Sequence, residues 1–91
     1  MRVANLKTDE QLRSLVRALR DHNVVEEDDG MYHVEVTPEN FKVLLENPDL
    51  IKVVRFMRPE SQEAVALGQY IAGWYGALIT PTWIIRAETK A

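Results

Sequence analysis

The two histidines of the chain are the first residues to examine for catalytic or metal chemistry, because imidazole binds metals and titrates near physiological pH. His33 faces Glu26 if the chain between them folds into a hairpin, and we expect the histidine of such a pair to titrate near neutral pH. His22 stands at the expected end of a helix, where a histidine commonly contacts the last carbonyl groups. The spacing of these residues matches no zinc-ligand pattern, and the chain has no cysteine. We therefore expect no metal site and no cofactor.

Nucleophilic residue types are present, but none stands in a motif that would activate it. No serine, threonine or lysine has the neighbours found in known nucleophile motifs. The carboxylates from Glu26 to Asp29 are contiguous, whereas an EF-hand loop spaces its calcium ligands at alternate positions. Acidic side chains at a hairpin tip keep a sheet edge soluble, and contact with a basic partner protein is the alternative interpretation. We expect no catalytic residues and no enzymatic activity.

Arg13, Arg17 and Arg20 are spaced to lie on one side of a helix, where they could contact phosphates. Asp9 stands four residues before Arg13, and Asp21 stands four residues after Arg17, so ion pairs within the helix would account for much of this charge. The net charge of −3 gives the chain no overall attraction for nucleic acid. The pattern favours an ordinary solvated face, and nucleic-acid binding through the three arginines is the alternative.

The most distinctive segment, residues 64–79, reads AVALGQYIAGWYGALI and contains no charge. A small residue recurs at every fourth position, which would form a stripe along one helix. Each glycine inside a helix costs about 1 kcal/mol relative to alanine, so close packing must compensate. Such a stripe allows two helix backbones to approach closely, either within the domain or between two copies of the chain. The residues expected at this interface are Ala64, Leu67, Gly68, Ile71, Ala72, Trp74, Tyr75 and Gly76.

The uncharged stretch from Ala64 to Ile85 is long enough to span a bilayer, but its composition argues against a membrane segment. Gln69 and Pro81 lie inside it, and Thr80-Pro81 is typical of a helix end. The first residues contain no apolar run that could serve as a secretory signal. We expect no membrane association and a cytoplasmic location, with which the lack of cysteine agrees.

Hydrophobic spacing and turn signals predict the elements of the first 57 residues. We expect a short strand over residues 2–6, a helix from Asp9 to His22 capped by Thr8, and a second helix over residues 38–46 capped by Thr37. Asp29-Gly30 predicts a two-residue type I′ turn with Gly30 at positive φ, and a hairpin in which Val25 faces Val34. Tyr32, Val34 and Val36 then share the buried face. Residues 50–57, LIKVVRFM, fit either a strand or a helix, and their β-branched residues favour a strand.

After these elements the pattern predicts a long helix opening at Pro59 and a last short strand in TWIIRA, residues 82–87. The resulting order is β-α-β-β-α-β-α-β, so the fold class is α+β with a ferredoxin-like first part. If residues 50–57 are helical, the alternative is a mostly helical domain with one β-hairpin.

The chain of 91 residues is long enough for one compact domain over residues 1–91 and too short for two. Its hydrophobic fraction of 46% and charged fraction of 27% are typical of globular proteins. We therefore expect a small non-enzymatic protein-interaction domain, such as an adaptor, assembly subunit or inhibitor. Self-association through the helix that opens at Pro59 would make the chain a homo-oligomer.

Overall fold

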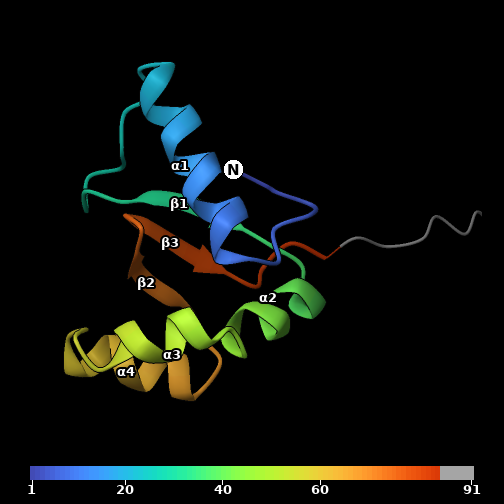
Figure 1. The fold of residues 1–91 in the computed structure, drawn as a ribbon, viewed down its shortest axis with the longest axis vertical. Coiled ribbons are helices and arrows are strands. Elements are labelled where there is room, and N and C mark those ends of the chain that lie inside the picture. The colour runs from blue at the N-terminus through green and yellow to red at the C-terminus, as the bar shows by residue number, and fades with distance from the viewer. Residues whose placement is uncertain (85–91) are drawn as a thin grey trace, which may run out of the picture.

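The structure, a computed structural model, describes residues 1–84 of the 91-residue chain. Within these residues, helices pack around a three-stranded mixed sheet, so the predicted α+β class is confirmed (Figure 1). The elements in chain order are α1 (Asp9–Asp21), β1 (Tyr32–Glu35), α2 (Pro38–Leu45), α3 (Pro48–Val54), α4 (Pro59–Ala66), β2 (Ile71–Trp74) and β3 (Ala77–Thr80).

The sheet has the strand order β1-β3-β2, so the last strand in the sequence is the central one. β3 pairs in parallel with β1, with Tyr32 opposite Ala77, and antiparallel with β2, with Ile71 opposite Ile79. A parallel pair needs a long crossover, and here α2, α3, α4 and β2 all lie between its two strands in the sequence. The crossover therefore places three helices beside the sheet (Figure 1).

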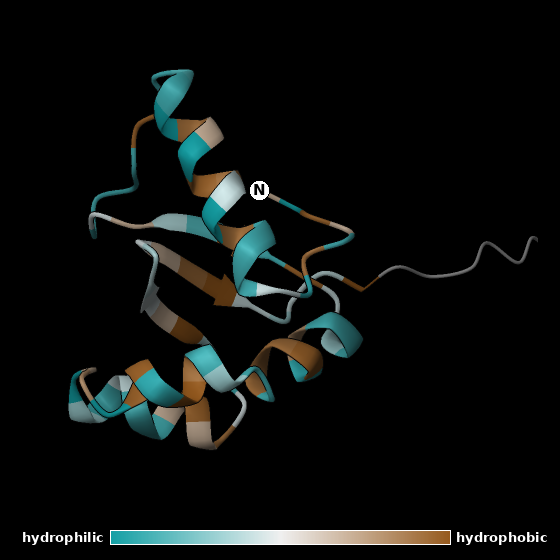
Figure 2. Cartoon of the chain, in the orientation of Figure 1, coloured by the Kyte–Doolittle hydropathy of each residue, from teal (hydrophilic) through white to brown (hydrophobic). Residues whose placement is uncertain are grey.

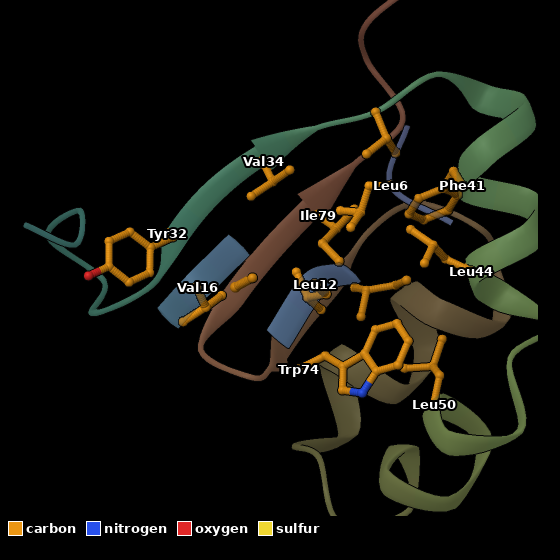
Figure 3. Packing of buried hydrophobic residues seen from close by; sticks show 13 residues of the cluster. Leu6, Leu12, Val16, Tyr32, Val34, Phe41, Leu44, Leu50, Trp74 and Ile79 are labelled. Carbon is orange, nitrogen blue, oxygen red and sulfur yellow. The ribbon is translucent and has the colours of Figure 1, made fainter. Parts of the chain in front are cut away.

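The hydrophobic core lies between the sheet and the helices (Figures 2 and 3). Tyr32, Val34 and Val36 alternate with more exposed residues along β1, and their predicted shared buried face is confirmed. Helix α1 contributes Leu12 and Val16 from one side of its surface. The remaining buried members of the cluster are Leu6, Phe41, Leu44, Leu50, Ile71, Trp74, Ala77 and Ile79.

The first predicted helix is confirmed, including the way it begins. Thr8 Oγ1 accepts a hydrogen bond from the Gln11 backbone N–H at 3.1 Å, and Gln11 Oε1 accepts one from the Thr8 N–H at 3.2 Å. This reciprocal capping box satisfies two donors that the helix itself cannot pair. The short strand predicted over residues 2–6 is reduced to an isolated bridge between Arg2 and Glu35 on the outer edge of β1.

The predicted hairpin around Asp29-Gly30 is wrong, although Gly30 has the expected positive φ of 80°. Val25 does not face Val34 but is 82% exposed, and Glu26 does not face His33. The inner partner of β1 is β3, because the alternating apolar side chains of both strands then cover one core. The outer edge of β1 bonds instead to the first residues of the chain, through the backbone of Met1 and Val3 to Glu35.

The strand predicted over residues 50–57 is wrong, because most of the segment belongs to α3. Asn47 Oδ1 accepts a hydrogen bond from the Asp49 N–H at 2.8 Å, and Pro48 occupies the first helical position. This start signal outweighs the strand preference of the β-branched residues, which is a weak and context-dependent term.

The long helix predicted to run from Pro59 through residue 79 is also wrong, because α4 ends at Ala66. Gly68 has φ 70°, its N–H bonds to the Val65 carbonyl, and the next N–H bonds to the Ala64 carbonyl. These bonds form a Schellman cap, in which glycine takes the left-handed conformation after the last turn. Residues 71–80 then form a β-hairpin.

The observed order α-β-α-α-α-β-β corrects both the predicted order and the ferredoxin-like first part, since only one strand precedes residue 57. The alternative correctly assigned most of residues 50–57 to a helix, but it omitted the parallel pairing of β1 with β3. Half of the predicted last strand, residues 85–87, lies outside the described residues, and its residues 82–84 are not in a strand.

Candidate functional site

An open cleft of about 1070 Å³ lies between strand β2 and the segment that joins α3 to α4. Tyr70, Ala72 and Trp74 line the cleft on the sheet side, and β2 is an edge strand there. On the opposite side the apolar lining residues are Val53, Phe56 and Met57. Strand β2 therefore forms one wall of the cleft, and the end of α3 with the residues after it forms the other.

Phe56 is the most exposed aromatic side chain in the described part of the chain, with 79% of its surface accessible. The guanidinium of Arg55 lies 5.1 Å from the centre of its ring, a cation–π contact at an exposed site. An exposed phenylalanine on the wall of a cleft has the composition expected of a binding surface.

Charged residues of both signs surround this apolar lining. Asp29 Oδ2 lies 2.7 Å from His33 Nε2, and its Oδ1 accepts a hydrogen bond from the Met31 N–H at 3.0 Å. These hydrogen bonds, that from His33 first, lower the pKa of Asp29. The other charged residues that line the cleft are Asp9, Arg13, Asp49, Lys52, Arg58 and Glu60.

The turn between β2 and β3 brings Tyr75 to the border of the cleft. Tyr75 has φ 54° and Gly76 has φ 78°, and both signs are those of a type I′ turn. Asparagine, aspartate or glycine usually occupies the first of these positions, because larger side chains resist positive φ. The Tyr75 ring stacks on Trp74 with 5.9 Å between centroids, and the Arg13 guanidinium lies 5.9 Å from its centre.

A second hollow of about 430 Å³, which we call the arginine hollow, opens between α1 and this turn. Its lining residues are Arg13, Val16, Arg17, Arg20, Asp21 and Tyr75. The predicted ion pairs of Arg13 with Asp9 and of Arg17 with Asp21 are wrong, because neither occurs within residues 1–84. The structure thus brings the three predicted arginines together with an aromatic ring that the sequence patterns did not associate with them.

The eight residues predicted to form a helix–helix interface do not share a helix face. Ala64 is buried in α4, whereas Leu67 is 63% exposed after its end. Ile71 and Trp74 belong to the core of the sheet. Ala72, Trp74 and Tyr75 line the cleft, and Gly68 and Gly76 have positive φ in a helix cap and a turn.

The histidines lie apart from one another in the fold. His22 Nδ1 is 2.8 Å from the Ala18 carbonyl oxygen, as expected for a histidine at a helix end, and His33 contacts Asp29. Across residues 1–84 there is no group of three or more histidine or acidic side chains placed to hold a metal ion. No helix in this range is long and apolar enough to cross a membrane.

Comparison with known proteins finds no matching family model, no similar curated protein and no similar solved structure. The site therefore has to be interpreted from its own chemistry.

The sequence patterns missed the wall of the cleft that contains Phe56 and Met57, because both residues were assigned to a strand. They also placed Tyr75 inside a helix. Aromatic and β-branched residues on both sides of Tyr75-Gly76 are a hairpin signal that could have located the turn.

Proposed function

We propose that the protein is a non-enzymatic protein-interaction domain that binds an extended segment of a partner along the edge of β2. The observation that carries this proposal is the cleft, in which the edge strand β2 lies opposite Val53 at the end of α3 and the exposed Phe56 that follows it. A bound strand would pair with main-chain groups of β2, and its side chains would contact Phe56 and Tyr70.

The two edges of the sheet differ in a way that supports this assignment. At β1 the Val3 N–H donates to the Glu35 carbonyl at 3.0 Å, and the Glu35 N–H donates to the Met1 carbonyl at 2.7 Å. Within the described residues, β2 has no such backbone partner on its outer side. Residues 69–78 also carry no charge, although charged side chains are a common protection of exposed edges.

A second copy of the chain is the partner we favour. Two copies of β2 could pair antiparallel about a two-fold axis, as self-complementary interfaces of dimers do. The mixed charges that line the cleft allow such an arrangement, because acidic and basic groups of one copy can face the opposite groups of the other. This replaces the predicted helix–helix contact with a contact between strands.

A non-catalytic role is supported by the polar groups of the cleft. Ser61 lines it, but within the described residues its side chain makes no hydrogen bond to a base that could activate it. The pair of His33 and Asp29 lies at the cleft border, and no nucleophile among residues 1–84 is in hydrogen-bond contact with it.

The test compares two double variants whose substituted side chains are exposed in the monomer. Val53→Ser with Phe56→Ser removes apolar surface from the cleft, and Ile51→Ser with Leu67→Ser removes it elsewhere. Sedimentation equilibrium over a range of concentrations should show a dimer for the parent and the control, and weaker association for the cleft variant. Selection of displayed peptides against the parent would identify a different partner if the chain stays monomeric.

The proposal fails if the parent is a monomer that selects no peptide. It also fails if the cleft and control variants lose association or peptide binding to the same extent, because the cleft would then have no specific role.

A further inference from the structure

We propose that the arginine hollow binds the phosphate monoester of a phosphorylated side chain. Arg13, Arg17 and Arg20 project from successive turns of α1 and are all exposed, so their guanidinium groups are accessible to a ligand. None of the three forms an ion pair within residues 1–84. Three positive charges thus line one concave surface without a carboxylate bonded to them in the described structure.

Two of these guanidinium groups rest on the β2–β3 turn. Arg13 lies over the Tyr75 ring, and Arg20 Nη2 is 3.1 Å from the position that a Cβ on Gly76 would occupy. These contacts restrict the two long side chains before any ligand arrives, which lowers the entropy lost on binding. Tyr75 also lines this hollow, and its hydroxyl makes no hydrogen bond in the described residues.

A phosphate monoester matches this set of donors better than a carboxylate does. It has three strong acceptor oxygens and a charge of about −1.5 to −2 near neutral pH, so three arginines can contact it together. A carboxylate has two oxygens and one charge, and it would leave part of the donor set unused.

The surrounding charges favour a single anionic group over an extended polyanion. Asp21 lines the hollow itself, and Asp9 and Asp29 line the adjoining cleft. With a net charge of −3, the protein would repel the successive phosphates of a nucleic acid on either side of the arginines. Nucleic-acid binding at the same arginines is therefore an outcome that the test must separate.

Arg13 and Tyr75 line both the arginine hollow and the cleft, so the two are neighbouring parts of one surface. A segment seated along β2 could therefore place a phosphorylated residue among the arginines. This delivery of the phosphate rests on the proposed function, whereas the phosphate site itself does not.

The test is an NMR titration of the ¹⁵N-labelled protein with capped phosphoserine amide. Separate titrations with capped serine amide, capped glutamate amide and a single-stranded oligodeoxythymidine serve as comparisons. Phosphoserine amide should shift the Arg13, Arg17, Arg20 and Tyr75 signals to saturation and bind more tightly than the other three probes. Arg17→Gln should weaken its binding about tenfold or more, since hydrogen bonds to charged groups contribute strongly. Arg55→Gln, an exposed arginine outside the hollow, should change nothing.

The absence of saturable shifts in the parent would overturn the proposal, as would equal binding of the serine or glutamate amide. Tighter, strongly salt-dependent binding of the oligonucleotide would replace it with nucleic-acid recognition. The cleft variant Val53→Ser with Phe56→Ser should still bind phosphoserine amide. The experiments therefore distinguish failure of the proposed cleft interaction from failure of the proposed phosphate binding.

Discussion

At the scale of single residues, Tyr75 has a backbone conformation that its side chain disfavours. A left-handed φ at a residue other than glycine costs on the order of 1 to 3 kcal/mol, and surrounding contacts must compensate for it. Here the ring contacts both Trp74 and the Arg13 guanidinium. The strained residue lies where the cleft and the arginine hollow meet, so it is placed to act in both proposed sites.

The glycine that follows Tyr75 allows a test of the turn. Gly76→Ala should lower the free energy of unfolding by about 1 to 2 kcal/mol, because alanine resists positive φ. Gly30→Ala, at φ 80° with no heavy atom near its new Cβ, is the matched control for backbone strain alone. Urea denaturation should show a similar loss of unfolding free energy for both variants, and only Gly76→Ala should also displace Arg20. An unchanged midpoint for Gly76→Ala would contradict the turn.

The contact of Asp29 with His33 predicts a specific dependence of stability on pH. The hydrogen bond with His33 and the Met31 N–H place the pKa of Asp29 below its ordinary value of 3.8 in the folded state. The stabilisation is therefore present above that ordinary value and is lost as the pH falls through the lowered pKa.

This effect is measured by unfolding the parent and Asp29→Asn between about pH 6 and pH 2, where carboxylates titrate. The difference in stability between the two proteins should shrink toward the acid end. Asp28→Asn, at an exposed neighbour without a side-chain hydrogen bond in the described residues, should show no such trend. A pH-independent difference for Asp29→Asn would exclude the contact as its source.

At the scale of elements, the start signals of short helices decide the central part of the fold. Helices α2, α3 and α4 have eight, seven and eight residues, and each carries proline in its first turn. Helices of this length are not stable alone, so their burial against the core must hold them. Phe41, Leu50 and Ala64 supply that burial, one from each helix.

The cap of α3 can be tested directly. Asn47→Ala should destabilise the protein by about 1 kcal/mol, because the Asp49 N–H loses its partner. The loss includes a weaker contact at 3.4 Å between Asn47 Nδ2 and Asp9 Oδ1. Glu46→Ala, at the exposed neighbouring position, is the control and should have little effect. Equal thermal midpoints for the two variants would argue that residues 48–54 are not held by this cap.

At the scale of the whole molecule, the sheet forms only when distant parts of the chain meet. β3 is central and pairs with β1, from which all of α2, α3, α4 and β2 separate it in the sequence. Contacts of this kind require the closure of a long loop before they contribute stability. The core is consequently shared by α1, the three short helices and all three strands.

Two neighbouring residues of β3 can be used to test the central position of this strand in the sheet. Ile79 is fully buried, so Ile79→Ala should cost about 2 to 5 kcal/mol, whereas Leu78→Ala should cost much less because Leu78 lies on the other face of the strand. Chemical denaturation of the two variants is the measurement. Equal losses would mean that the strand does not present alternate faces to the core and to solvent.

The sequence by itself determined the parts of this protein that depend on local interactions. The capping box at Thr8, the amphipathic pattern of α1, the cap of α2 at Thr37 and the positive φ of Gly30 follow from neighbouring residues. The alternation of Tyr32, Val34 and Val36 likewise indicated which face of β1 is buried. In each case the interacting groups are only a few positions apart, so the local sequence pattern is sufficient to predict the structure.

Only the tertiary structure decided how β1 is paired and what the glycines of residues 64–79 do. An apolar segment with glycines at helical spacing can pack as a helix or as a hairpin, and local propensities differ by too little to select one. Burial of Ile71, Trp74 and Ile79 against β1 and the helices selected the hairpin, which gave Gly68 and Gly76 positive φ. The same long-range packing placed Tyr75 beside the arginines of α1. A contact between residues so far apart in the sequence depends on the free energy of the whole core, which local patterns do not contain.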